Sequence, residues 1–225
     1  MKFRCAELSL ELDEPLMATA PVAPRWELVE RAKPWGSDHR LVAEGAKVLL
    51  VRRFSDAPTS SERRYLVCTN GARDPCCAIR GPAVAQALER VRPGQVYECS
   101  HLGGHRFAAN VLVLPDGLCF GRLDARSAPT LADELDAGRL PLEHLRGRTA
   151  FEPEQQAAEI LVRRELALAG LADLTLVEGT TFRLPDGRHV AAVVRGEQLE
   201  QHRVSCRNEK MEAAVRWELE ELVLA

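Results

Sequence analysis

Four side chains that bind transition metals lie within one short segment of this sequence. Cys68 and Cys77 are separated by eight residues, and a histidine pair follows in His101-Leu102-Gly103-Gly104-His105. Thiolate and imidazole both suit zinc, copper and iron, and a set of two sulfur and two nitrogen ligands indicates zinc or an iron–sulfur cluster. The adjacent glycines allow a tight turn, so that both imidazoles can face one small object. If the four residues hold a redox centre, the protein carries electrons rather than transforming a substrate.

Both pairs of candidate ligands begin where a predicted strand ends. Residues 64–68 are expected to form a strand that ends at Cys68, and residues 95–100 a strand that ends beside His101. Between them the sequence predicts a helix that opens at Gly81-Pro82 and continues through residue 90, with Pro82 in its first turn. Open α/β sheets gather their functional sites at such strand ends. A further buried strand is predicted over 46–54, where the sequence is apolar.

The segment after the histidines predicts a hairpin and a helix. Two apolar strands, over 109–114 and 118–123, flank a turn of sequence Pro115-Asp116-Gly117. A helix over 130–137 is expected to end at Gly138, and a helical turn to follow near 142–145.

Composition changes near both ends of the chain and predicts three parts. Residues 1–45 contain Pro15, Pro21, Pro24 and Pro34, which predicts an N-terminal arm packed on the core domain of residues 46–150. Residues 151–225 predict a small α+β C-terminal domain. Its expected elements are a helix over 153–169, strands over 174–177, 181–184, 189–194 and 200–206, and a final helix over 212–224.

The charge balance excludes several function classes. Thirty basic and thirty-three acidic residues among 225 give a net charge of −3, which predicts neither nucleic-acid binding nor a polybasic membrane patch. No apolar run approaches the roughly 20 residues that span a bilayer. The first residues do not resemble a signal peptide, so we expect a cytoplasmic protein with no membrane partner.

Seven cysteines in such a chain favour metal or redox chemistry over a disulfide framework. Four of them lie in or beside apolar runs, and we expect these to pack as small buried apolar side chains. They are Cys5, Cys99, Cys119 and Cys206.

The order of these features resembles a known group of proteins. A Cys-x8-Cys pair at a strand end, a helix, a strand, a pair spaced by three residues and a hairpin ending in Phe-Gly are similar to the thioredoxin-like [2Fe-2S] ferredoxins. Those proteins have two cysteines where this chain has His101 and His105. The His-x-Gly-Gly-His pattern resembles the sucrase/ferredoxin-like family, including its bis-histidinyl members. Residues 5–36, with Glu14-Pro15-Leu16 and Pro34-Trp35-Gly36, resemble the N-terminal pattern of the same family.

The resemblance implies an α/β fold, a thioredoxin-like ferredoxin domain with a mixed sheet, and a cofactor. The implied cofactor is one [2Fe-2S] cluster on Cys68, Cys77, His101 and His105. Cys76, directly beside Cys77, stays an alternative ligand. The implied function is electron transfer with an unidentified redox partner protein, rather than catalysis. The "sucrase" label implies a hydrolase, but no pair of carboxylates is distinguished by its setting, as glycoside hydrolysis requires.

Two other functions compete with this interpretation. Two cysteines and two histidines could form a structural zinc site in a binding module, although Cys-x8-Cys is longer than the usual zinc spacing. A thioredoxin-like thiol oxidoreductase is the second, although Cys-x-x-Cys at a helix start is usual and here the cysteines are adjacent.

Charges flank the candidate ligands at Arg73, Asp74 and Arg106. They are either solvated loop charges or groups that raise the potential of the centre through hydrogen bonds and positive charge. A histidine on iron also keeps a second ring nitrogen, so reduction could be coupled to proton uptake.

Overall fold

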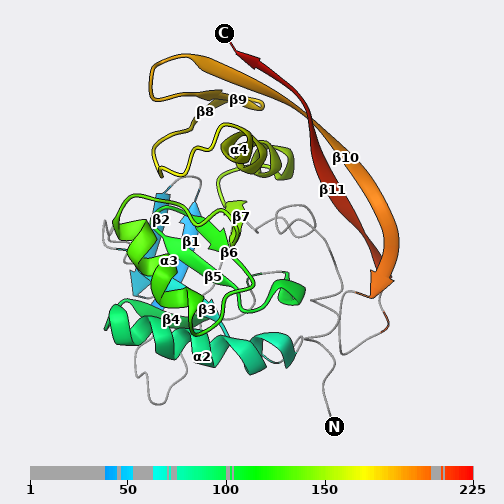
Figure 1. The fold of residues 1–225 in the computed structure, drawn as a ribbon. Helices are drawn as coiled ribbons and strands as arrows, with labels where there is room; N and C mark the ends of the chain where they lie inside the picture. Colours follow the sequence, from blue (N-terminus) through cyan, green and yellow to red (C-terminus); the bar gives the residue numbers. More distant parts are fainter. Residues whose placement is uncertain are drawn as a thin grey trace.

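The computed structural model describes residues 39–44, 47–52, 63–69, 71, 75–99, 102, 104–203, 209 and 211–224. In these ranges the chain forms three sheets and the helices α2 (Pro75–Val91), α3 (Ser127–Asp136) and α4 (Pro153–Glu165), as Figure 1 shows. Most of the predicted N-terminal arm lies outside the described residues. The strand predicted over 46–54 is confirmed as β2 (Lys47–Arg52), which pairs with β1 (His39–Glu44) in a two-stranded sheet.

The central sheet has five strands in the order β4-β3-β5-β6-β7. The strands are β3 (Arg64–Cys68), β4 (Val96–Cys99), β5 (Val111–Leu114), β6 (Leu118–Phe120) and β7 (Leu145–Arg148). Strands β3 and β4 are parallel and are joined by α2, whereas β5, β6 and β7 are antiparallel to their neighbours. A parallel pair with a crossover helix, followed by a hairpin and a helix, confirms the expected thioredoxin-like α/β fold with a mixed sheet. The helical turn predicted near 142–145 is a turn at 142–144 that leads into β7.

Helix α2 begins earlier than the sequence predicted. The expected start at Gly81-Pro82 is wrong, because the helix begins at Pro75 and contains Cys76 and Cys77 in its first turn. Pro82 therefore lies inside the helix rather than at its start. Proline in a helix interior removes one backbone hydrogen bond. The buried face of α2, which includes Val84, Ala87 and Leu88, offsets this cost by packing against the sheet.

Side chains of the central sheet alternate between two buried faces, as the pleat requires. On one face, β3, β5 and β6 pack against α2 and α3, with Tyr65, Val67, Val111, Val113 and Phe120 in the main core. On the other face, the intervening residues form a second cluster that contains Leu66, Cys68, Leu112, Cys119 and, from the start of α2, Cys76 and Cys77. We call the second face the cysteine face.

The C-terminal part contains α4 and a four-stranded sheet in the order β11-β10-β9-β8. The strands are β8 (Thr175–Glu178), β9 (Thr181–Arg183), β10 (His189–Arg203) and β11 (Met211–Leu224). Helix α4 begins at Pro153, behind a capping box in which Glu152 and Gln155 exchange hydrogen bonds with the backbone. Ala158 and Val162 of α4 pack on Phe182 and Val190 of the sheet.

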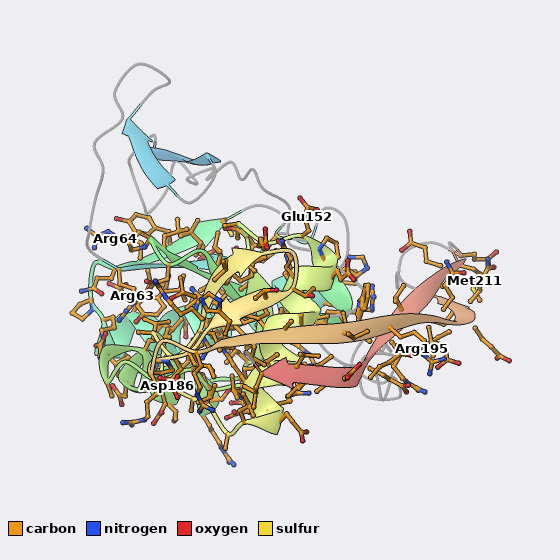
Figure 2. The ribbon with its side chains drawn as sticks, turned by 90° about the horizontal axis from the view of Figure 1, so that it is seen from above. Arg63, Arg64, Glu152, Asp186, Arg195 and Met211 are labelled. Carbon is orange, nitrogen blue, oxygen red and sulfur yellow. The ribbon has the colours of Figure 1, made fainter. Side chains whose placement is uncertain are left out.

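Two predictions for this part are wrong. Residues 189–194 and 200–206 were expected to form separate strands, but 189–203 is the single strand β10. Residues 212–224 were expected to form a helix, but they form β11. Backbone hydrogen bonds along β10 outweigh the helical preference of alanine, glutamate and leucine in this segment. In Figure 2 the paired strands extend away from the body, with Arg195 along their length and Met211 at the far end of β11.

None of the helices in the described ranges is both long enough and apolar enough to cross a membrane.

Candidate metal centre

Cys68 and Cys77 lie side by side at the junction of β3 and α2. Cys68 is the last residue of β3, and Cys77 is the third residue of α2. Their thiols share a hydrogen bond, and each residue is only 1% exposed. The structure thus brings together the two sulfur donors that the sequence proposed as ligands.

Gly81 makes this junction possible. A β-carbon at position 81 would collide with the backbone carbonyl oxygen of Cys68 and would crowd the Thr69 side chain. Because glycine has no β-carbon, α2 can lie directly against the end of β3. The position of Cys77 relative to Cys68 therefore depends on a glycine one turn further along the helix.

Cys76 is also buried, at 4% exposure, in the first turn of α2. It lies close enough to raise the pKa of the Cys77 thiol, although the largest cause of that rise is the hydrogen bond between Cys77 and Cys68. The contact between Cys77 and Cys68 agrees with the Cys-x8-Cys pair that the sequence analysis proposed. The choice between the two as a metal ligand stays a prediction.

Two further thiols share the cysteine face. Cys99 is the register partner of Cys68 in the parallel pair β3–β4, and Cys119 lies in β6. Burial is the main cause that raises the pKa of both thiols, and the nearby Cys68 raises it further. Both were expected to be small buried apolar side chains, and their exposures of 4% and 0% confirm this. Cys5 and Cys206 lie outside the described residues.

His105 begins a short 3-10 helix, η1 (His105–Phe107), which contacts α2. Gly104, before it, has a φ of 62°, a left-handed conformation that favours glycine, as the tight turn was expected to require. His105 is half-buried. His101 lies outside the described residues.

In the described part of the chain, no three His, Cys, Asp or Glu side chains are grouped so that they could hold a metal ion. The four-ligand site therefore stays a prediction. The donor types fit a two-iron cluster, in which each iron takes two outer ligands, because the cysteine pair can lie together on one iron while the imidazoles approach the other.

Arg106 is not a solvated loop charge. It is only 8% exposed, and its guanidinium lies 4.8 Å from the centre of the Phe107 ring. The guanidinium groups of Arg122 and Arg146 lie 5.3 Å and 5.2 Å from the same ring centre. Three cationic groups thus lie around the ring of Phe107, which follows residues 101–105. We call residues 101–105 the histidine loop. Arg73 and Asp74 lie outside the described residues.

Asn110 joins the histidine loop to β3, the strand that ends at Cys68. The sequence analysis did not identify it as a functional residue. Its backbone oxygen accepts a hydrogen bond from the Cys68 N–H at 3.0 Å. Its side-chain amide donates to the Gly104 carbonyl oxygen at 2.9 Å. The residue is fully buried. A polar residue directly before the apolar run 111–114 was the signal that could have identified it.

Residues 10–147, more than half of the chain, match the sequence model of the sucrase/ferredoxin-like family. The chain belongs to this family. The match spans β3, α2 and the segment with Cys68, Cys77, His101 and His105, so the resemblance seen in the sequence is confirmed at the level of the family. The C-terminal part, which includes α4 and the four-stranded sheet, lies beyond the family match.

Individual relatives overlap with parts of the chain. The Altered inheritance of mitochondria protein 32 of Eremothecium gossypii is 29% identical over 101 residues, which cover 38% of this chain and 32% of that protein. The chain thus spans about a third of the length of this curated relative. A thioredoxin-like [2Fe-2S] ferredoxin from Aquifex aeolicus overlaps with a TM-score of 0.35 and 18% identity, over 42% of this chain and 97% of the ferredoxin. A serine-for-cysteine variant of that ferredoxin overlaps with a TM-score of 0.35 and 15% identity, over 39% of this chain and 100% of the variant.

Proposed function

We propose that this chain binds one [2Fe-2S] cluster through Cys68, Cys77, His101 and His105 and exchanges electrons with a redox partner protein. The observation that carries the proposal is the buried, hydrogen-bonded thiol pair at the β3–α2 junction, in a chain that belongs to the sucrase/ferredoxin-like family. When bound, such a cluster accepts and releases one electron. Cys68 and Cys77 would hold one iron, and His101 and His105 the other.

The residues around the thiol pair would keep water away from the sulfur atoms. Cys68 and Cys77 lie in an apolar cluster with Leu66, Leu102 and Leu112, all at most 1% exposed. The two imidazoles carry less negative charge than two thiolates, so they favour acceptance of an electron. Centres with two histidine ligands reach potentials of roughly −150 to +300 mV for this reason.

The histidines also offer a place for a proton. An imidazole that binds iron through one ring nitrogen keeps the other, and added negative charge on the centre favours protonation there. Electron uptake by a bound cluster would therefore be coupled to proton uptake at His101 or His105.

Thiol–disulfide exchange is less well supported. A nucleophilic cysteine needs a lowered pKa, because the thiolate is the reactive form. In the metal-free chain the hydrogen bond with Cys68 and burial instead raise the pKa of Cys77. The cysteines of the described ranges are free thiols, which fits the reducing cytoplasm that we propose as the location.

Metal analysis tests the proposal directly. We expect the full chain, purified without oxygen, to be coloured and to contain iron and acid-labile sulfide in equal amounts. A colourless protein with one zinc per chain would replace the cluster by a structural zinc site. A metal-free protein with a readily oxidised thiol pair would favour thiol chemistry.

A further inference from the structure

We propose that Asn110 and Arg146 form a positioning pair, which fixes the histidine loop against Cys68 and makes the redox centre easier to reduce. This inference rests on the proposed function. It assigns a role to two buried polar residues that are not candidate ligands, and it follows from the contacts of Asn110.

Asn110 touches both halves of the candidate site. Its backbone oxygen binds the Cys68 N–H, and its side-chain amide group binds the carbonyl oxygen of Gly104, the residue before His105. The end of β3 and the start of η1 are thus linked through a single residue. Any rotation of the Asn110 side chain would release the backbone that carries His105.

Arg146 of β7 holds the Asn110 side chain in place. Its Nη1 donates to Asn110 Oδ1 at 2.9 Å and lies 3.6 Å from the Cys119 sulfur. Arg146 is only 1% exposed. Because an acceptor on one side of the amide is bound by a cation, the amide N–H on the other side becomes a stronger donor to Gly104.

The sequence leaves room for this cation at Gly121. A β-carbon there would lie 2.8 Å from Cδ of Arg146 and 3.1 Å from Cβ and the carbonyl oxygen of Phe107. The guanidinium then lies over the Phe107 ring. Packing, and not solvent, therefore sets where the positive charge lies.

A buried positive charge on the cysteine face acts on the oxidation state of the centre. Cys119, which Arg146 contacts, lies on the same face of the sheet as Cys68. Charge interactions are stronger in a protein interior than in water. Reduction adds one negative charge, so Arg146 stabilises the reduced state.

The first experiment separates charge from structure by measuring the midpoint potential of the iron–sulfur centre. We expect Arg146→Met to lower the affinity of the centre for an electron by on the order of tenfold. For a one-electron couple this corresponds to a midpoint potential that is lower by about 59 mV. Arg146→Lys keeps the charge and should retain most of the potential. Arg139→Gln removes an exposed arginine that pairs with Glu134, and it should leave the potential unchanged.

The second experiment needs no metal and tests the positioning role. Hydrogen exchange of the metal-free chain is followed for peptides that cover residues 104–109. Asn110→Ala keeps the backbone acceptor of Cys68 but deletes both side-chain contacts, so exchange should accelerate there. The matched control is Gln156→Ala, which removes another fully buried amide with two backbone acceptors, at Arg148 and Phe151. It should leave exchange at 104–109 unchanged.

The outcomes distinguish the two proposals. A wild-type chain without iron and sulfide overturns the proposed function together with this inference. A wild-type chain and an Arg146→Met variant that hold the same centre at the same potential overturn the inference alone. If Asn110→Ala does not fold, the comparison of Arg146→Met with Arg146→Lys decides.

Discussion

Gly81 of α2 packs against the backbone carbonyl group of Cys68 at the end of β3. This contact sets how closely the helix that carries Cys77 approaches the strand that carries Cys68. It also restricts position 81 to glycine, because the obstructing group is the backbone carbonyl of Cys68, which cannot rotate away as a side chain can.

Gly81→Ala should therefore destabilise the fold and separate the thiol pair. We expect a loss of about 1–3 kcal/mol in the free energy of unfolding, as for other overpacked positions. Urea unfolding of the metal-free chain measures this, and iron content after reconstitution should fall in parallel. Gln86→Ala, at an exposed position of the same helix, is the control. Wild-type stability and iron content for Gly81→Ala would contradict the proposed role of the contact.

Serine substitutions distinguish the adjacent cysteines. We expect Cys77→Ser to lose the iron–sulfur centre, because the hydroxyl group is a poor replacement for the thiolate that pairs with Cys68. Cys76→Ser should retain iron and sulfide at the wild-type ratio. The measurement is metal and sulfide per chain, with the visible spectrum. The reverse result would make Cys76 the ligand and leave Cys77 as a buried neighbour.

The midpoint potential should fall as pH rises over part of the accessible range. A proton on the outer ring nitrogen of a ligand histidine favours the reduced state, and deprotonation removes that contribution. Voltammetry from mildly acidic to alkaline pH measures the slope. A flat potential would show that electron and proton uptake are independent, even in a chain that holds the cluster.

The metal-free chain should lose stability at alkaline pH. The pKa of Cys77 is raised by its hydrogen bond with Cys68 and by burial, and that of Cys99 and Cys119 mainly by burial. The unfolded chain releases these protons above the ordinary thiol pKa of 9.0, whereas the folded chain retains them until its higher pKa values are reached. Stability is therefore fully present below pH 9.0 and falls above it, by about 1.4 kcal/mol per pH unit for each thiol.

Urea unfolding of the metal-free protein at several pH values between neutral and alkaline tests this expectation. A Cys99→Ala, Cys119→Ala double variant should reduce the slope, because two of the three protons are removed. Stability that does not change across this range would mean that the buried thiols ionise as readily as exposed ones.

A buried ion pair connects α4 to the central sheet. Glu159 Oε1 lies 2.9 Å from Nε of Arg148 in β7 and 3.0 Å from Nη2 of Arg163, and Glu159 and Arg163 are at most 1% exposed. Glu159→Gln would leave two cations without their carboxylate, which should cost about 3–5 kcal/mol of stability. Glu134→Gln, which breaks the exposed pair with Arg139, should cost far less, because solvent screens that pair. Equal losses in urea unfolding would contradict this role of burial.

The sequence predicted strands β3, β4, β5 and β6 of the central sheet because they are short, apolar and separated by clear turns, but it did not predict β7. Residues 64–68, 109–114 and 118–123 carry this pattern, and the Pro115-Asp116-Gly117 turn fixes the hairpin between them. Pro82 misled the prediction for α2, since a proline at a helix start and a proline inside a packed helix look alike without the tertiary contacts.

The C-terminal ribbon could not be predicted for a different reason. Residues 212–224 contain alanine, leucine and glutamate at spacings that suit a helix, and only the long-range pairing with β10 makes a strand. The candidate ligands were found through residue type and spacing, which are local in the sequence. Arg146 was missed, because its contact with Asn110 joins β7 to the residue before β5 and leaves no local pattern.

The alternation of side chains in β3 restricts how this chain and its relatives can change length. Leu66 and Cys68 point to one side of the sheet, and Tyr65 and Val67 to the other. An insertion or deletion of one residue in this strand would turn the Cys68 thiol away from Cys77 and into the main core, and would move a core side chain to the cysteine face. Relatives that keep the site must therefore keep the spacing from Tyr65 to Cys68 intact.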